Sequence, residues 1–250
     1  MKTQHLTAAE WIYLENPLLA WPHKFIAYTL LELLFLGVLK LETRRAPHYG
    51  PPDPRAGGVM HFLDFGPYVN KFHYYRHQAI FIKHIELNGE SSLGNMMKRV
   101  RSRLGGENGS QIIEYFIIPL LQDRKVLWTP YRGVHLAQIY LSYLKRRVRL
   151  MKKSLKSLDL HDLEQSTRHL ILSDFGPLIL FEECKIAQEV KGQKMSFKLQ
   201  KNRAFYDFRL KEEVEEMEVF FPDFPIHRLL RLCKRYFPPV YIEPDFDISY

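Results

Sequence analysis

The sequence predicts an α+β fold that is mainly α-helical, with a winged-helix-like unit over residues 1–66 and small β-hairpins. Two apolar helical patterns open the chain, two alternating segments then flank a loop dense in proline and glycine, and a long amphipathic pattern follows. The 250 residues are 46% hydrophobic and 14% aromatic, which is enough apolar material for a folded core. We expect residues 67–250 to form a mainly helical remainder that packs with the first unit as one compact body.

The first unit begins with two predicted helices. Thr7 and Glu10 have the spacing of a capping box, and the first helix should end before Pro17. The second helix covers HKFIAYTLLELLFLG and stops at Gly37. Its apolar run is shorter than the roughly 20 residues of a spanning helix and has Glu32 at its centre, so we interpret it as a buried helix.

A hairpin with a long tip should follow these helices. The segments VLKLETRR and VMHFLDF alternate as strands do, and residues 46–58 between them are rich in proline and glycine. Two helices followed by a hairpin is the order of elements in a winged-helix unit.

The tetrapeptide DFGP occurs twice, at Asp64 and at Asp174, and in protein kinases Asp-Phe-Gly holds a catalytic magnesium. The glycine-rich loop, the strand lysine and the catalytic loop of a kinase are not in this sequence. We therefore interpret both motifs as turns between elements. In the first motif, Gly66 permits the turn and Pro67 begins the next helix.

Three further segments are less regular. Residues 110–133 repeat the order of an apolar helix, a polar break at 122–125 and an alternating strand, which is either a second winged-helix-like unit or a chance pattern. Residues 184–202 resemble a hairpin that turns at 191–193. Residues 236–250 are rich in proline and aromatic side chains and are expected to form an extended tail.

Sequence motifs of common enzymes are absent: there is no G-x-S-x-G, Walker A loop, H-E-x-x-H or C-x-x-C. We expect a non-enzymatic protein without a cofactor or a metal. His73, His77 and His84 would share one stripe of a helix, unless the second half of the segment is a strand, but the last two would lie about 10 Å apart along it, too far to bind one ion. His73 and His77 could pair on a metal only with a third ligand, such as His61 or Asp64. The two cysteines, Cys184 and Cys233, are expected to be reduced and packed.

The most informative segment is the predicted basic amphipathic helix at residues 135–158. Its basic residues gather on one side, and no acidic residue occurs between Arg132 and Leu158. A core helix with a solvated lysine face has a similar pattern, and that interpretation stays open. Together with a second basic group before residue 105, this helix gives the candidate anion-binding residues, which are Lys145, Arg146, Arg149, Lys152, Lys153, Lys156, Lys98, Arg99, Arg101 and Arg103.

A formal net charge of +8 favours anionic partners. The segment LLELLFLGVLKLE, residues 30–42, resembles the helix-to-strand segment of the Golgi phosphoprotein family. That resemblance implies a peripheral protein that binds phosphoinositide headgroups through basic residues.

Nucleic acid is the second class of anionic partner. The second helix offers mainly Thr29 and Glu32, so reading of base edges by it is not expected. A wing with Arg44, Arg45, His48 and Arg55 would still reach a phosphate backbone.

The sequence therefore predicts a binding or adaptor protein that docks on acidic lipid headgroups through the basic helix. It is expected in the cytoplasm, peripheral at a membrane. The alternatives are a winged-helix protein that binds nucleic-acid phosphates and a structural subunit whose basic face meets an acidic protein.

Overall fold

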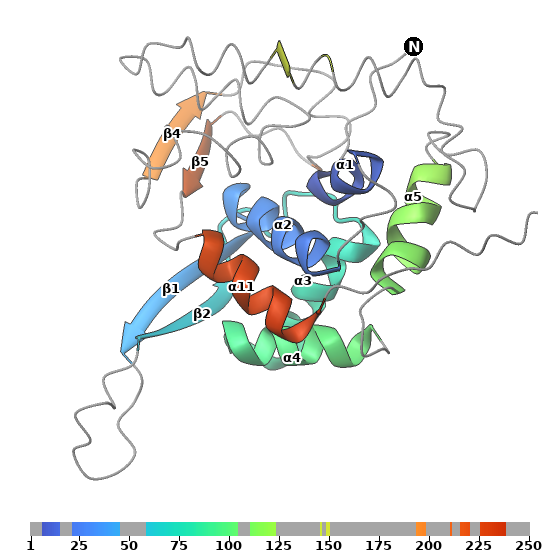
Figure 1. Cartoon of the computed structure of the whole chain (residues 1–250). Coiled ribbons are helices and arrows are strands. Elements are labelled where there is room, and N and C mark those ends of the chain that lie inside the picture. Colours follow the sequence, from blue (N-terminus) through green and yellow to red (C-terminus); the bar gives the residue numbers. More distant parts are fainter. Residues whose placement is uncertain are drawn as a thin grey trace, which may run out of the picture.

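A computed structural model describes residues 7–15, 22–45, 59–104, 111–123, 146, 149–150, 194–198, 211, 216–220 and 226–238. These residues form a mixed α+β structure that is mostly helical, with one small three-stranded antiparallel sheet (Figure 1). The predicted α+β class is confirmed at this level.

Both N-terminal helices form as predicted. In α1, Ala8–Glu15, the backbone N–H of Thr7 donates to Glu10 Oε2 over 2.6 Å and that of Glu10 donates to Thr7 Oγ1 over 3.2 Å, which is a capping box. The second helix, α2, covers Pro22–Phe35 and is followed by Gly37 with φ 65°. Gly37 and Val38 donate to the carbonyls of Leu34 and Leu33, the bonding pattern of a Schellman cap.

α2 is enclosed on nearly every side. Lys24 is the single residue of this helix that is not buried, and Thr29 and Glu32 are 0% and 1% exposed. The side chains of Thr29 and Glu32, which the sequence placed on the surface of this helix, therefore lie inside the protein, and the expectation that the helix does not read base edges stays a prediction. Glu32 accepts a hydrogen bond from Gln78 Nε2 over 3.0 Å, so its carboxylate is used inside the protein.

The predicted hairpin is confirmed. β1, Leu39–Arg45, pairs antiparallel with β2, Val59–Phe65, and Leu39 faces Phe65 in the register. A two-residue strand, β3, Ser91–Ser92, pairs with β2 and completes the sheet in the order β1-β2-β3.

The DFGP turn closes the hairpin against the end of α2. Gly66 donates to Val38 O over 2.8 Å, and a Cβ at Gly66 would lie 2.0 Å from the carbonyl oxygen of Gly37. The side chain of Asp64 accepts from the N–H of Phe65 and pairs with Lys40, which are structural contacts. Pro67 does not begin a helix, because a turn follows it and the next helix starts only at Arg76.

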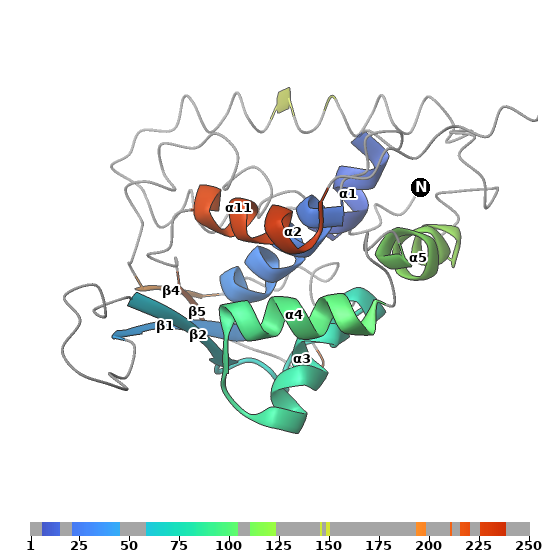
Figure 2. The same cartoon turned by 60° about the horizontal axis from the view of Figure 1, so that its bottom comes forward.

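The remaining helices surround the same core. They are α3, Arg76–Asn88; α4, Leu93–Arg103; a π-helical turn, η2, Ile113–Ile117; α5, Ile118–Asp123; and α11, Ile226–Tyr236. Buried side chains from α1 through α11 form one hydrophobic cluster, in which Phe25, Phe81 and Phe237 are 0% exposed. α11 lies along α2 and α4 in both views (Figures 1 and 2).

Of three further predictions, two differ in part from the structure and one is untested. β4, Lys194–Lys198, pairs with an unpredicted strand, β5, Glu216–Phe220, whereas the rest of the hairpin expected at 184–202 lies outside the described residues. In the segment 110–133 the helix continues to Asp123, past the expected break at 122, and the expected strand lies outside the described residues. The boundary at residues 66 and 67 stays a prediction.

Candidate anion-binding surface

The first basic group predicted from the sequence lies on α4. Lys98, Arg99 and Arg103 are exposed and Arg101 is half-buried. The helix begins where the N–H of Asn95 donates to Ser92 Oγ over 3.3 Å. Its other side is buried through Leu93, Met96, Met97 and Val100, so packing of these apolar side chains directs the basic ones outward.

α11 provides a second basic group that the sequence analysis missed. Its sequence, IHRLLRLCKRY, contains Arg228, Arg231, Lys234 and Arg235, all exposed, and no acidic residue. At 100° per residue these four side chains fall within about 120° of one another. The opposite side carries the buried Leu229, Cys233 and Phe237. This helix is a basic amphipathic helix.

α4 and α11 pack against each other through their apolar sides. The Cys233 thiol on α11 lies 3.8 Å from the Met97 sulfur on α4, and both side chains are 0% exposed. Together the two helices contribute eight basic side chains and no carboxylate. Within the described part of the chain, none of the eight forms an ion pair. We call these eight side chains of the two helices, of which Lys98 and Arg228 line one pocket, the basic face: Lys98, Arg99, Arg101, Arg103, Arg228, Arg231, Lys234 and Arg235.

Burial and neighbouring basic side chains lower the pKa values of three histidines next to the basic face. Burial and the nearby Lys234 and Lys24 lower the pKa of His23 to about 4. Burial, and then Arg228, lower the pKa of His61, while burial followed by Arg103 and Arg99 lowers that of His84. In each of these histidines burial is the largest cause of the lowered pKa, and the neighbouring cations add to it.

The hairpin offers a contrast, because its cations are paired. Arg44 bonds to Glu42 and to Glu90, and Lys40 lies 2.9 Å from Glu42 Oε1. Arg44 therefore takes part in ion pairs at the sheet, and its contact with a phosphate backbone stays a prediction. Of the other wing residues, the Arg45 side chain, His48 and Arg55 lie outside what the structure describes.

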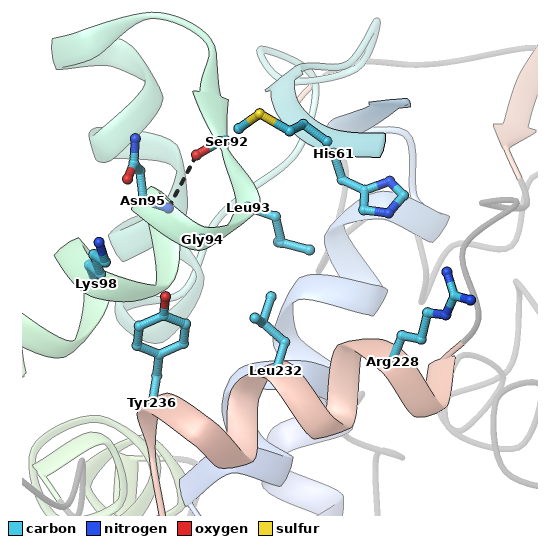
Figure 3. A pocket seen from close by; sticks show the side chains of 10 residues that line it. His61, Ser92, Leu93, Gly94, Asn95, Lys98, Arg228, Leu232 and Tyr236 are labelled. Atoms are coloured by element: carbon cyan, nitrogen blue, oxygen red, sulfur yellow. Dashed lines mark hydrogen bonds between the residues drawn. The ribbon is translucent and has the colours of Figure 1, made fainter. Parts of the chain in front are cut away.

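A pocket of about 470 Å³ opens between β2, the start of α4 and α11 (Figure 3). Its lining includes three basic side chains, one from each element: His61, Lys98 and Arg228. None of the described residues that line it is acidic. A neighbouring pocket of about 690 Å³ also contains Lys98, together with Arg99 and the carboxylate of Glu90 that is paired with Arg44.

The predicted stripe at residues 135–158 is described at three positions. Arg146 and Arg149 are helical and exposed, and Leu150, expected on the apolar side, is 54% exposed. The remaining stripe residues lie outside the described residues: Lys145, Lys152, Lys153 and Lys156.

His73, His77 and His84 do not share one helix, because α3 begins at Arg76 and His73 precedes it. His77 and His84 are buried, and the His84 ring lies 3.1 Å from Ser91 Oγ. In the described ranges, no group of three or more His, Cys, Asp or Glu residues could hold a metal ion.

The thiol of Cys233 is buried, as expected, and burial raises its pKa above the usual range. Cys184 lies outside the described residues. Asp174, in the second DFGP motif, is likewise not described.

No known family model, curated protein or solved structure matches this chain. Among the helices that the structure describes, none is both long and apolar enough to cross a membrane.

Proposed function

We propose that this chain is a non-enzymatic protein that docks on anionic membrane surfaces through the basic face of α4 and α11. The observation that supports this most is α11, in which four exposed cations share one arc, no acidic residue intervenes, and the opposite arc is anchored in the core. Solvated helical faces usually alternate signs of charge, whereas a face of one sign attracts phosphates. The predicted stripe at residues 145–156 would extend the same surface.

Lipid headgroups are favoured over nucleic acid for two reasons. A winged helix reads bases with an exposed helix in the major groove, and α2 is buried along its length. The basic face also has exposed apolar neighbours, because Met60, 37% exposed, lines the same pocket as Lys98 and Arg228, with Val59, 58% exposed, beside it. Apolar side chains beside cations are typical of surfaces that lie at a bilayer interface.

The finer features of this proposal are the winged-helix-like character of residues 1–66, a relationship to the Golgi phosphoproteins, and a cytoplasmic protein peripheral at a membrane. The order α1, α2, β1, β2 supports the first of these. The resemblance of residues 30–42 supports the second. A structural subunit with an acidic protein partner is the remaining alternative, and it would use the same basic face.

The triple variant Arg231→Gln, Lys234→Gln, Arg235→Gln tests the proposal. Each cation near an anionic surface contributes about 1 kcal/mol, so we expect binding to acidic vesicles to fall on the order of a hundredfold. The fold should persist, because all three side chains are exposed and such changes usually stay within about 0.5 kcal/mol.

A matched control removes the same charge elsewhere. Lys71 precedes α3 and is half-buried, whereas Arg76 and Lys83 are exposed residues of α3. Replacing these three by glutamine should leave vesicle binding nearly unchanged. Equal losses in the two variants would mean that net charge, and not the basic face, determines binding, and would refute the proposal.

A further inference from the structure

The pocket between β2, α4 and α11 has two polar ends and an apolar middle. Figure 3 shows Lys98 beside the hydroxyl of Tyr236 at one end, and His61 beside Arg228 at the other. Leu93 and Leu232 lie between these ends. Arg228 and Tyr236 are eight residues apart on α11, so the ends are separated by about 12 Å along that helix.

The side chains at each end suit a phosphate. The guanidinium of Arg228 is able to donate two parallel hydrogen bonds to phosphate oxygens, and the ring of His61, whose Nδ1 lies 3.0 Å from Thr43 Oγ1, lies beside it (Figure 3). At the far end the ammonium of Lys98 acts as a compact charge next to a hydroxyl donor. Among the described residues that line the pocket, none carries a carboxylate that would oppose an anion.

We propose that this pocket binds a small molecule with a phosphate at each of its two ends and a less polar middle. A single phosphate would engage one end and leave the other cation unpaired, whereas a molecule of the right length engages both at once. The volume of about 470 Å³ is in the range of small-ligand sites and exceeds what one phosphate fills. This inference does not depend on membrane docking, since it concerns a soluble ligand.

Calorimetric titration with simple probes tests the proposal. Hexanediol bisphosphate has the two ends, hexyl phosphate has one, ethanediol bisphosphate is too short to reach both, and suberate replaces the phosphates by carboxylates. We expect hexanediol bisphosphate to bind at least about tenfold more tightly than each of the other three. Equal affinity for hexyl phosphate or ethanediol bisphosphate would overturn the two-ended geometry, and equal affinity for suberate would overturn the choice of phosphate.

Two double variants with the same net charge show whether the ligand binds in the pocket. Lys98→Gln with Arg228→Gln removes the cation at each end, and binding of hexanediol bisphosphate should fall to the level of an unspecific anion. Arg103→Gln with Arg231→Gln removes two exposed cations from the same helices outside the pocket, and binding should persist. Equal losses in both would contradict the proposal. Because vesicles are not used, a failure here and a failure of membrane docking are separate results.

Discussion

At Gly66 the neighbouring backbone leaves no room for a side chain. Its missing Cβ would meet the carbonyl oxygen of Gly37 at 2.0 Å, and both groups belong to the junction between α2 and the hairpin. We expect Gly66→Ala to lower the free energy of unfolding by about 3 kcal/mol, since main-chain atoms have to shift. Urea denaturation measures this loss.

Gly94 is the matched control for this change. A Cβ at Gly94 would meet nothing nearer than the Tyr236 hydroxyl at 3.8 Å, and Gly94 lies inside α4. Gly94→Ala should therefore be neutral or stabilise by up to about 1 kcal/mol. A loss at Gly94 as large as the loss at Gly66 would show that close approach to Gly37 is not the cause.

His23 makes stability depend on pH. Burial, with Lys234 and Lys24, lowers its pKa from 6.5 to about 4 in the folded protein. Below pH 6.5 the unfolded chain takes up this proton while the folded chain does not, so stability present at pH 7 is lost as the pH falls from about 6.5 to 4. The shift corresponds to a loss of about 3 kcal/mol at most.

Comparison with His23→Gln isolates this effect. His61 and His84, whose pKa values are also lowered, are present in both proteins, so their contribution cancels. We expect urea titrations at pH 7 and pH 4.5 to show a smaller acid loss in the variant. An identical loss in both proteins would mean that His23 does not titrate as described.

Among the helices and strands, the sequence predicted the ones that have strong local signals. The capping box of α1, the glycine end of α2 and the alternating strands of the hairpin all depend on neighbours in the chain, and all were found. α11 was missed because the segment that follows it is rich in proline and aromatic residues and favoured an extended tail. In IHRLLRLCKRY, the basic residues on one side of a helix and the apolar residues on the other could have indicated α11.

The predicted stripe and α11 are distinguishable as docking elements. Replacing Lys145, Arg149, Lys152 and Lys156 by glutamine removes four charges, and we expect binding to acidic vesicles to fall by up to about a thousandfold if all four lie on the surface. Vesicle sedimentation of this variant measures the change. Unaltered binding would assign docking to α4 and α11 alone, and loss of cooperative unfolding would show that the stripe is buried instead.

At the scale of the molecule, tertiary packing determined what sequence reasoning could not. Residues of α4 and α11 are more than a hundred positions apart, and their packing, which includes the contact of Met97 with Cys233, brings Lys98 and Arg228 to one pocket. The pairing of Arg44 with Glu90 likewise depends on β3 and its neighbours reaching the hairpin. Long-range contacts of this kind leave no periodic pattern in one sequence.

Vesicle sedimentation tests the central claim most directly. The protein is mixed with vesicles of neutral lipid alone, or with added phosphatidylserine or a phosphoinositide, at low and at high salt, with duplex DNA and RNA as competitors. We predict that the protein binds acidic vesicles and does not bind neutral ones. High salt should weaken this binding because exposed charges are screened, and duplex DNA or RNA should displace little of the protein. Binding to nucleic acid in preference to acidic vesicles, or no binding to either, would contradict membrane docking through the basic face.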